Sequence, residues 1–369
     1  MKTEDFYWYW LNTISGIGNR TIGRLLDRFG TPKQIYHTEE REIASVLRTK
    51  KQQSAFHMSK NKAPVIDSYN NISAGGITFL HPDSPLFPER LKTIPDMPYG
   101  LYLKGILPPE EKKTVAMIGA RSCTRYGKEM ARFFASELAG CGVGIISGLA
   151  RGVDGMAHVG ALEADGYTLG VLGGGIDQIY PIEHAALFQQ IEQSGGLISE
   201  SGPGIQPVAG LFPMRNRLIA GFADGILVVE AMEKSGTFIT VDQGLEQGKE
   251  IFALPGRLTD SKSAGCNRLI QMGAHIVTGV EDVLELLQID NTSRPKRNRP
   301  ERSEEEIHKM SLAPLEKMVY SCLRIEPKYV DVIISEVRVA PQEVCMALNQ
   351  LVLCGAVVET TRNYYAIKL

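Results

Sequence analysis

The sequence predicts an α/β protein built on an extended, Rossmann-like, doubly wound parallel sheet, with a helical module before it and a winged helix after it. Three observations support this fold class. Short apolar runs alternate with amphipathic helical patterns between residues 113 and 288, and such alternation implies parallel strands with right-handed crossovers. The runs are almost continuously apolar, as strands covered on both faces must be. Most of them stop at glycine or at a charged residue, which places loops at the carboxyl ends of the strands, where such sheets bind ligands.

The expected elements follow one another in a simple order. Seven strands are predicted in the central domain: 115–118, 143–147, 168–172, 196–199, 226–229, 250–254 and 275–277. Helical patterns, such as 128–138 and 241–247, lie between them. Changes in composition then suggest five segments: a helical module at 1–60, a bridging segment at 61–112, the Rossmann-like domain at 113–288, a charged linker at 289–310 and a winged helix at 311–369.

The overall composition is that of a soluble globular protein. Hydrophobic residues make up 43% of the chain and charged residues 22%, with a formal net charge of −2. No apolar run is long enough to cross a bilayer, and the first residues lack the basic and apolar regions of a signal peptide. The six cysteines show no CxxC spacing. We therefore expect a cytoplasmic protein with no membrane contact, no disulfide framework and no metal site.

The loops that follow the strands suit phosphate groups but do not suit a dinucleotide. A nicotinamide-binding domain would show GxGxxG after its first strand and an acidic residue near the end of its second. The chain has Gly119-Ala120-Arg121-Ser122 and Ser147-Gly148 at these places, so a dehydrogenase is excluded and no cofactor is expected. Bare glycine backbone in these loops, and at 173–175, would let N–H groups approach an anion closely.

The positions of the cations indicate where the anion binds. Between residues 115 and 287 there are 12 Lys and Arg residues against 19 Asp and Glu residues, a net charge of −7. Six of the twelve cations nevertheless lie at or just after strand ends: Arg121, Arg125, Arg151, Arg215, Arg217 and Lys234. Arginine grips phosphate bidentately and stacks on bases. With Phe212 and Phe238 nearby in the sequence, this edge favours a chain of nucleotides over one small phosphate.

At this point six segments, in order and with fitting spacing, resemble the DprA/Smf family of bacterial DNA-processing proteins. They are 118–127 (IGARSCTRYG), 147–158 (SGLARGVDGMAH), 171–181 (VLGGGIDQIYP), 212–217 (FPMRNR), 230–237 (EAMEKSGT) and 255–274, which contains Pro255-Gly256, Asn267, Leu269-Ile270 and Gly273-Ala274. Two departures from the family pattern stand out. Ile182 replaces a basic or polar residue, and Cys266 replaces the threonine of a Gly-Thr-Asn motif.

The resemblance implies a protein that binds single-stranded DNA, forms a homodimer, protects incoming DNA and helps to load the RecA recombinase during natural transformation. It implies no catalysis, since no nucleophile and base are paired in the sequence. The DNA-binding residues that it implies, together with those in the glycine loops, are Gly119, Arg121, Ser147, Gly148, Arg151, Gly152, Gly174, Arg215, Asn216, Arg217, Lys234, Ser235, Gly236, Thr237 and Phe238.

Two other sequence features leave alternatives open. Asp154 and His158 are four residues apart on a predicted helix, and can be an acid–base pair or, as we expect, structural groups. Glu230 and the Ser235-Gly236-Thr237 loop resemble, weakly, a glutamate and glycine loop of nucleotide phosphoribohydrolases. A phosphoribohydrolase-like enzyme is therefore the alternative function, and a purely structural dimer scaffold is a third hypothesis.

The flanking segments offer further interpretations. The Gly16-Ile17-Gly18 turn resembles that of a helix-hairpin-helix (or SAM-like) module that faces DNA phosphates, or else only joins two packed helices; the first 60 residues carry a net charge of +4. The linker is a flexible tether or a basic arm on DNA. The winged helix has equal numbers of Lys/Arg and Asp/Glu, six each, and no cation in its expected recognition helix. We therefore expect it to contact protein more than DNA.

Overall fold

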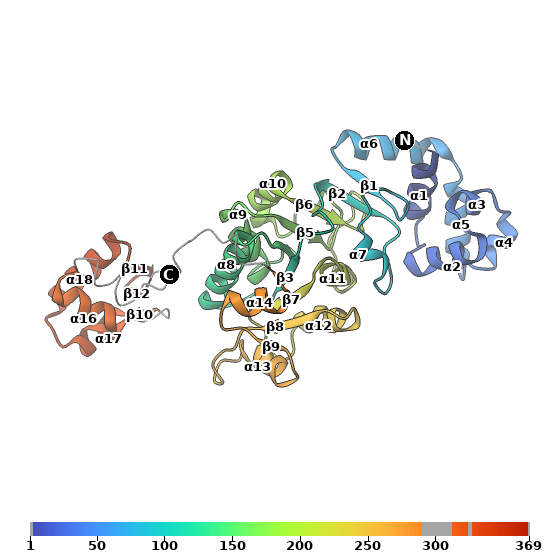
Figure 1. The fold of residues 1–369 in the computed structure, drawn as a ribbon. Helices are drawn as coiled ribbons and strands as arrows, with labels where there is room; N and C mark the ends of the chain where they lie inside the picture. The colour runs from blue at the N-terminus through green and yellow to red at the C-terminus, as the bar shows by residue number, and fades with distance from the viewer. Residues whose placement is uncertain (1–2, 290–311, 324–326, 368–369) are drawn as a thin grey trace. The chain divides into compact units, whose positions relative to one another are not determined.

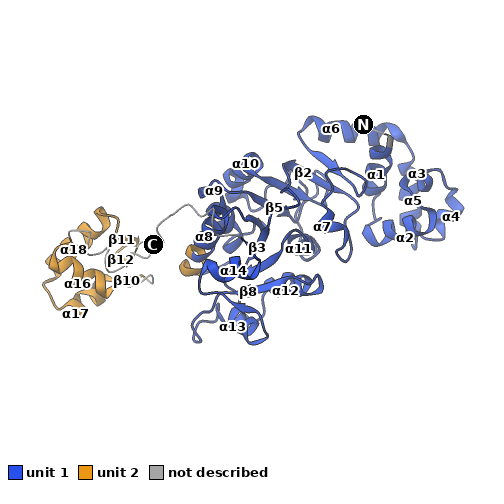
Figure 2. Ribbon diagram, in the orientation of Figure 1, with its two compact units in different colours: residues 1–123, 130–293 blue, residues 124–129, 294–369 orange. Residues whose placement is uncertain are grey.

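The computed structural model describes residues 3–289, 312–323 and 327–367. The chain divides into two compact units (Figure 2): the first contains residues 1–123 and 130–293, and the second contains residues 124–129 and 294–369. The predicted 1–60, 61–112 and 113–288 segments thus fall largely in one unit. Apart from Ile289, the predicted linker at 289–310 lies outside the described residues, so its character and the five boundaries stay predictions.

A nine-stranded sheet forms the centre of the first unit (Figure 1), in the order β1-β2-β6-β5-β4-β3-β7-β8-β9. The strands from β3 onward are β3 (Thr114–Ile118), β4 (Gly144–Ser147), β5 (Thr168–Leu172), β6 (Gly196–Ser199), β7 (Gly225–Val228), β8 (Glu250–Ala253) and β9 (His275–Ile276). All of these pair in parallel. The predicted α/β fold with a largely parallel sheet is therefore confirmed, with each strand within two residues of its expected bounds at either end.

The bridging segment extends the sheet, which the sequence did not indicate. Strand β1 (Thr78–Leu80) pairs antiparallel with β2 (Leu101–Gly105), and β2 pairs antiparallel with β6. Between them lies the short helix α7 (Glu89–Lys92). These strands are short and lie among prolines, and the partner β6 of strand β2 is about a hundred residues away. No local sequence pattern therefore predicts them.

Helices cover both faces of the sheet because the side chains of each strand point alternately to opposite sides. They are α8 (Arg125–Gly140), α9 (Val153–Glu163), α10 (Ala185–Ser194), α11 (Leu211–Phe222), α12 (Thr237–Glu246), α13 (Ala264–Gln271) and α14 (Val280–Leu286), with a single 3-10 turn, η1 (Ile182–His184). On β3, Val115 packs in the core of α8, α9 and α14, whereas Ala116 packs in the core of α11 and α12. Two buried cores thus hold the strand ends in fixed positions.

The N-terminal part is helical, as predicted, and packs around its own core of aromatic and aliphatic side chains, with Trp10 fully buried. Its helices are α1 (Thr3–Thr13), α2 (Asn19–Phe29), α3 (Pro32–His37), α4 (Glu40–Ala44), α5 (Lys50–Ser59) and α6 (Lys62–Ala74). The turn between α1 and α2 has Gly16 at φ +77°, a conformation that favours glycine. Its assignment as a helix-hairpin-helix stays a prediction.

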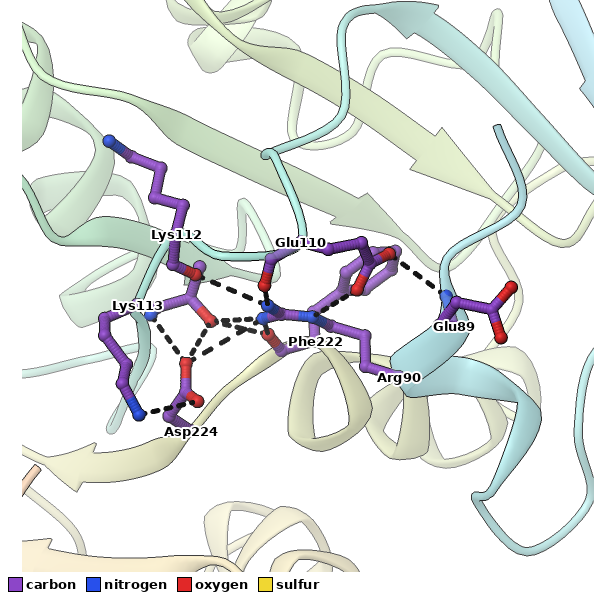
Figure 3. Close-up of polar contacts among 8 residues, drawn as sticks. Glu89, Arg90, Glu110, Lys112, Lys113, Phe222 and Asp224 are labelled. Carbon is purple, nitrogen blue, oxygen red and sulfur yellow. Dashed lines mark hydrogen bonds and ion pairs between the residues drawn. The ribbon is translucent and has the colours of Figure 1, made fainter. Parts of the chain in front are cut away.

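Arg90 fixes the bridging segment to the beginning of the central strands (Figure 3). Its guanidinium donates to Thr114 Oγ1 at 2.8 Å and to the carbonyl oxygens of Phe222, Glu110 and Lys112 at 2.6, 2.8 and 3.3 Å. Asp224 lies 3.8 Å from Nη1, and accepts a further hydrogen bond from the Thr114 backbone N–H. One arginine thus joins α7, the segment before β3 and the turn before β7.

The second unit holds a separate small core around α16 (Pro314–Cys322), α17 (Val330–Val337) and α18 (Pro341–Leu353). Three short strands pair antiparallel in the order β10-β12-β11: β10 (Lys328–Tyr329), β11 (Val357–Thr361) and β12 (Tyr364–Ile367). Its assignment as a winged helix stays a prediction. In the described part of the chain, no helix has the length and apolar character needed to span a membrane.

Candidate nucleic-acid interface

A groove of about 720 Å³ runs along the edge where β3, β4 and β7 end. It is formed by the loops after these strands, by Tyr180 from the loop after β5, and by the residues that lead into α11. Its lining includes the following predicted residues: Gly119, Arg121, Arg215, Asn216, Lys234, Ser235, Gly236 and Thr237. The structure therefore brings together eight of the fifteen predicted contacts, from the loop after β3, the loop before α12, helix α11 and the first residue of α12.

Two exposed cations face the groove. Arg121 follows β3, and its guanidinium carbon lies 4.9 Å from the centre of the Phe212 ring, in a cation–π contact. Lys234 belongs to the loop before α12 and is exposed. Within the described residues, neither side chain forms an ion pair. A third cation, Lys262, lines the groove and donates to the Ser122 carbonyl oxygen at 2.7 Å; the sequence did not single it out.

The loop at 234–237 leads directly into α12. The backbone N–H of Thr237 donates to Ser235 Oγ at 3.0 Å, and Ser235 Oγ donates to Thr237 Oγ1 at 2.7 Å. Gly236 precedes the helix without a side-chain cap. The loop therefore has an ordered shape that presents Lys234 and backbone groups to the groove. Phe238, predicted to be a DNA contact, instead packs partly buried against the core and does not line the groove.

Arg215 lies at the floor of the groove and is almost fully buried. Nη1 donates to the carbonyl oxygen of Gly148 at 2.9 Å and also to that of Val171, while Nε donates to Asn216 Oδ1 at 3.2 Å. Burial lowers the pKa of Arg215 to about 10, and the nearby Asp154 opposes this shift. The guanidinium therefore remains charged at neutral pH, and it ties together the ends of β4 and β5.

Asp154 is a buried residue that lines the groove together with Arg215, whereas His158 is fully buried and does not line it. Asp154 accepts a hydrogen bond from the Gly148 backbone N–H at 3.2 Å. Its burial raises the pKa of the carboxyl, and Arg215 opposes that shift. His158 is fully buried, its Nδ1 lies 2.7 Å from Thr168 Oγ1, and burial lowers its pKa to about 3. The two side chains bond to different partners, which supports structural roles over an acid–base pair.

Arg217 is also committed to contacts within the protein. It pairs with Glu200 at 2.8 Å and donates to the carbonyl oxygens of Asp96 and Met214 at 3.0 and 3.1 Å. The same Glu200 oxygen accepts a hydrogen bond from the amide of Asn19, at the start of α2. Arg217 does not line the groove, and it connects the strand-end edge to the N-terminal helices. Its predicted contact with DNA remains a proposal.

Two glycines are required by close packing. A Cβ atom at Gly148 would lie 2.6 Å from Arg215 Nη2 and 2.8 Å from an Asp154 carboxylate oxygen. Gly152 has φ +77°, and a Cβ there would lie 2.3 Å from the Ala120 carbonyl oxygen. Gly152 therefore lets the loops after β3 and β4 approach one another, and Gly148 leaves room for Arg215 and Asp154. Gly174, in turn, packs against Pro207 beside a small neighbouring hollow.

Two predicted polar contacts have partners elsewhere in the protein. Ser147 is fully buried and donates to the Met117 carbonyl oxygen at 2.6 Å. Arg151 forms an ion pair with Glu183. Neither residue lines the groove. Glu230, on which the phosphoribohydrolase alternative rests, is 3% exposed and does not line the groove either. No group of three or more His, Cys, Asp and Glu residues in the described ranges could hold a metal ion.

The largely parallel sheet and the groove with exposed cations at its strand ends define a Rossmann-like protein that lacks the dinucleotide fingerprint. Residues 78–288 match the family model described as DNA recombination-mediator protein A, so the chain belongs to that family. This result confirms the family resemblance of the sequence motifs.

Individual relatives are similar over different lengths. Protein Smf of Escherichia coli (strain K12) is 44% identical over 207 residues, which are 56% of this chain and 55% of that protein. The chain therefore spans about half the length of that relative. An X-ray structure of DNA processing protein A (DprA) from Streptococcus pneumoniae has a TM-score of 0.66 and 31% identity, and covers 77% of this chain and 98% of that one. A second structure is that of DNA processing protein A from Helicobacter pylori, described in terms of its unique single-stranded DNA binding mode. It has a TM-score of 0.51 and 30% identity, and the match covers 57% of this chain and 95% of that one.

Proposed function

We propose that this protein is a recombination mediator that binds single-stranded DNA in the groove at the strand ends. The observation that carries the proposal is the pair of exposed cations, Arg121 and Lys234, which face the groove without an ion-pair partner in the described residues. Phosphates would supply the missing counter-charge, and the Phe212 ring under Arg121 adds an aromatic surface suited to nucleotides. Family membership and the structural likeness to the Helicobacter pylori protein, which binds single-stranded DNA, support the same ligand.

We also propose a wider role for the protein. It works in the cytoplasm as a homodimer, protects incoming DNA and helps to load RecA during natural transformation. It acts by binding DNA and catalyses no reaction. The test is the rate at which RecA filaments form on single-stranded DNA with and without the protein. We expect faster filament formation, and we expect Arg121→Ala to abolish the gain. A parallel assay should find that oligonucleotides and nucleoside monophosphates remain intact.

DNA binding itself is tested with Arg121→Ala and Lys234→Ala in fluorescence-anisotropy titrations with a labelled oligo-dT strand. Each substitution should weaken binding between about 10-fold and 150-fold, because a charge-assisted hydrogen bond to phosphate contributes roughly 1.5–3 kcal/mol in a protein. Arg132→Ala is the matched control: it removes the same charge from an exposed arginine that is already paired with Glu163 outside the groove. If the two groove variants bind like Arg132→Ala, the strand does not occupy this groove.

A further inference from the structure

Two chemically different sets of residues line the groove. One set, the cationic wall, carries cations and backbone groups at 119–122, 234–237 and Lys262. The other set, the apolar wall, has no charge and consists of Tyr180, Pro207, Ala209, Phe212 and Pro213. The two sets meet where the Arg121 guanidinium lies over the Phe212 ring. A strand of DNA likewise has charged phosphates and apolar base faces, so the groove offers a suitable surface to each.

Tyr180 is the one aromatic side chain on the apolar wall that is largely open to solvent, with 40% of its surface exposed. The centre of its ring lies 5.7 Å from that of Phe212, with an angle of 41° between the rings. Phe212 is held in turn by Arg121 at 4.9 Å and Arg215 at 5.9 Å from its ring centre. The Tyr180 ring thus rests on a supported aromatic base while it keeps free surface for a ligand.

The sequence around Tyr180 adds to this surface. Ile179 is 41% exposed and Ile182 is 74% exposed, so two apolar side chains next to Tyr180 in the sequence are also open to solvent. Exposed apolar side chains that gather at one place on a soluble protein mark a binding site. A base with an aromatic face would cover this surface, whereas an isolated phosphate would not.

We propose that bound DNA lies with its bases against the apolar wall and its phosphates against the cationic wall, and that one base stacks on Tyr180. The proposal rests on the groove being the single-stranded DNA site. It makes Tyr180 a residue that determines specificity. Stacking accepts every base, so sequence preference is weak, but it requires an unpaired base and thus disfavours both duplex DNA and strands without bases.

The test compares an ordinary oligonucleotide with one of equal length and charge in which every base is missing. The parent protein should bind the ordinary strand between about 5-fold and 150-fold more tightly, the range expected when one base stacks on an aromatic ring. Tyr180→Ala should lose most of this advantage while its affinity for the baseless strand is unchanged. Tyr180→Phe should behave like the parent, because the ring and not the hydroxyl makes the contact. Arg121→Ala should weaken both strands by the same factor.

Tyr364→Ala is the matched control. Tyr364 is 41% exposed and rests on the ring of Tyr329 at 5.0 Å, but it belongs to the second unit. This variant should bind both strands as the parent does. As a direct readout, an oligonucleotide with 2-aminopurine should lose fluorescence on binding to the parent and keep more of it on binding to Tyr180→Ala.

The outcomes separate this inference from the proposed function. If Tyr180→Ala keeps the full preference for bases, the base does not stack on Tyr180, and the strand orientation is wrong even though the groove binds DNA. If the parent binds neither strand, the proposed function itself fails, and the inference fails with it. A preference that is lost equally in Tyr180→Ala and Tyr364→Ala would also overturn the assignment.

Discussion

Arg90, at the edge of the central sheet where strands begin, and Arg121, at the edge where strands end, differ in their partners. At the edge where strands begin, the Arg90 guanidinium donates four hydrogen bonds within the protein and lies near two carboxylates (Figure 3). At the edge where strands end, Arg121 and Lys234 face a groove without an ion pair among the described residues. The comparison indicates that the partners of a cation, more than its position at a strand end, decide whether the cation is available to a ligand.

Arg215 lies at the strand-end edge but has the bonding pattern of Arg90, and this gives the largest expected effect. Arg215→Ala should lower the free energy of unfolding by about 3–5 kcal/mol, because it leaves the buried Asp154 without its counter-charge. Urea denaturation measures the change. An Arg215→Ala protein that unfolds at the parent's urea midpoint but fails to bind DNA would instead place this guanidinium among the ligand contacts.

Arg90→Ala should come next, with a loss of about 2–3 kcal/mol in the free energy of unfolding, because several hydrogen bonds from a charged donor are removed from one partly buried site. DNA affinity should be unchanged in the folded protein, since the residue does not line the groove. Arg90→Lys is the informative companion: it keeps the charge but cannot reproduce the forked donor geometry, so it should recover only part of the stability. Full recovery would show that charge alone matters at this edge.

Arg121→Ala should show the opposite behaviour. Its free energy of unfolding should stay within about 0.5 kcal/mol of the parent's, because an exposed side chain is removed. The slope of log affinity against log salt concentration for single-stranded DNA should fall by about 0.7, the value for one lost phosphate contact. Arg132→Ala should leave the slope unchanged. An unaltered slope in Arg121→Ala would remove the distinction between the two edges.

The smallest expected effect concerns His158, which differs from the arginines at both edges. It is a fully buried base whose hydrogen bond in the described residues is to Thr168 and not to a carboxylate. Its pKa is lowered from 6.5 to about 3 in the folded protein, so between these pH values the unfolded chain binds the additional proton. Stability is therefore lost as the pH falls below about 6.5. The free energy of unfolding should drop by about 1 kcal/mol between pH 6.5 and 5.5 from this group. His158→Gln should show a flatter pH dependence; an equal slope would assign the loss to other groups.

Much of the fold could be predicted because its signals are local. The apolar runs at β3 to β8 and the glycines after them are visible in the sequence, and they fixed both the sheet and the edge that carries the groove. The antiparallel strands β1 and β2 were missed because β2 joins the sheet through β6, a distant segment of the chain, and β1 joins it through β2.

The site was predicted less completely, for a physical reason. A sequence shows where an arginine lies but not how many of its donors are taken. Arg217 and Arg121 looked equivalent in the sequence, yet one pairs with Glu200 and the other faces the groove. Tyr180 was visible only as part of a Tyr-Pro motif, because its proposed role depends on the ring of Phe212, which belongs to helix α11.

The space at Gly148 has a consequence for how this family can change over generations. The Arg215 guanidinium occupies the place where a side chain at 148 would be, and Asp154 is buried against both. A larger residue at 148 would require the loss of the guanidinium, which would strand the carboxylate. The residues at positions 148, 154 and 215, separated by as many as 67 residues in the chain, therefore depend on one another. We expect a single substitution at any of the three to destabilise the fold, so evolution should conserve or replace these residues together.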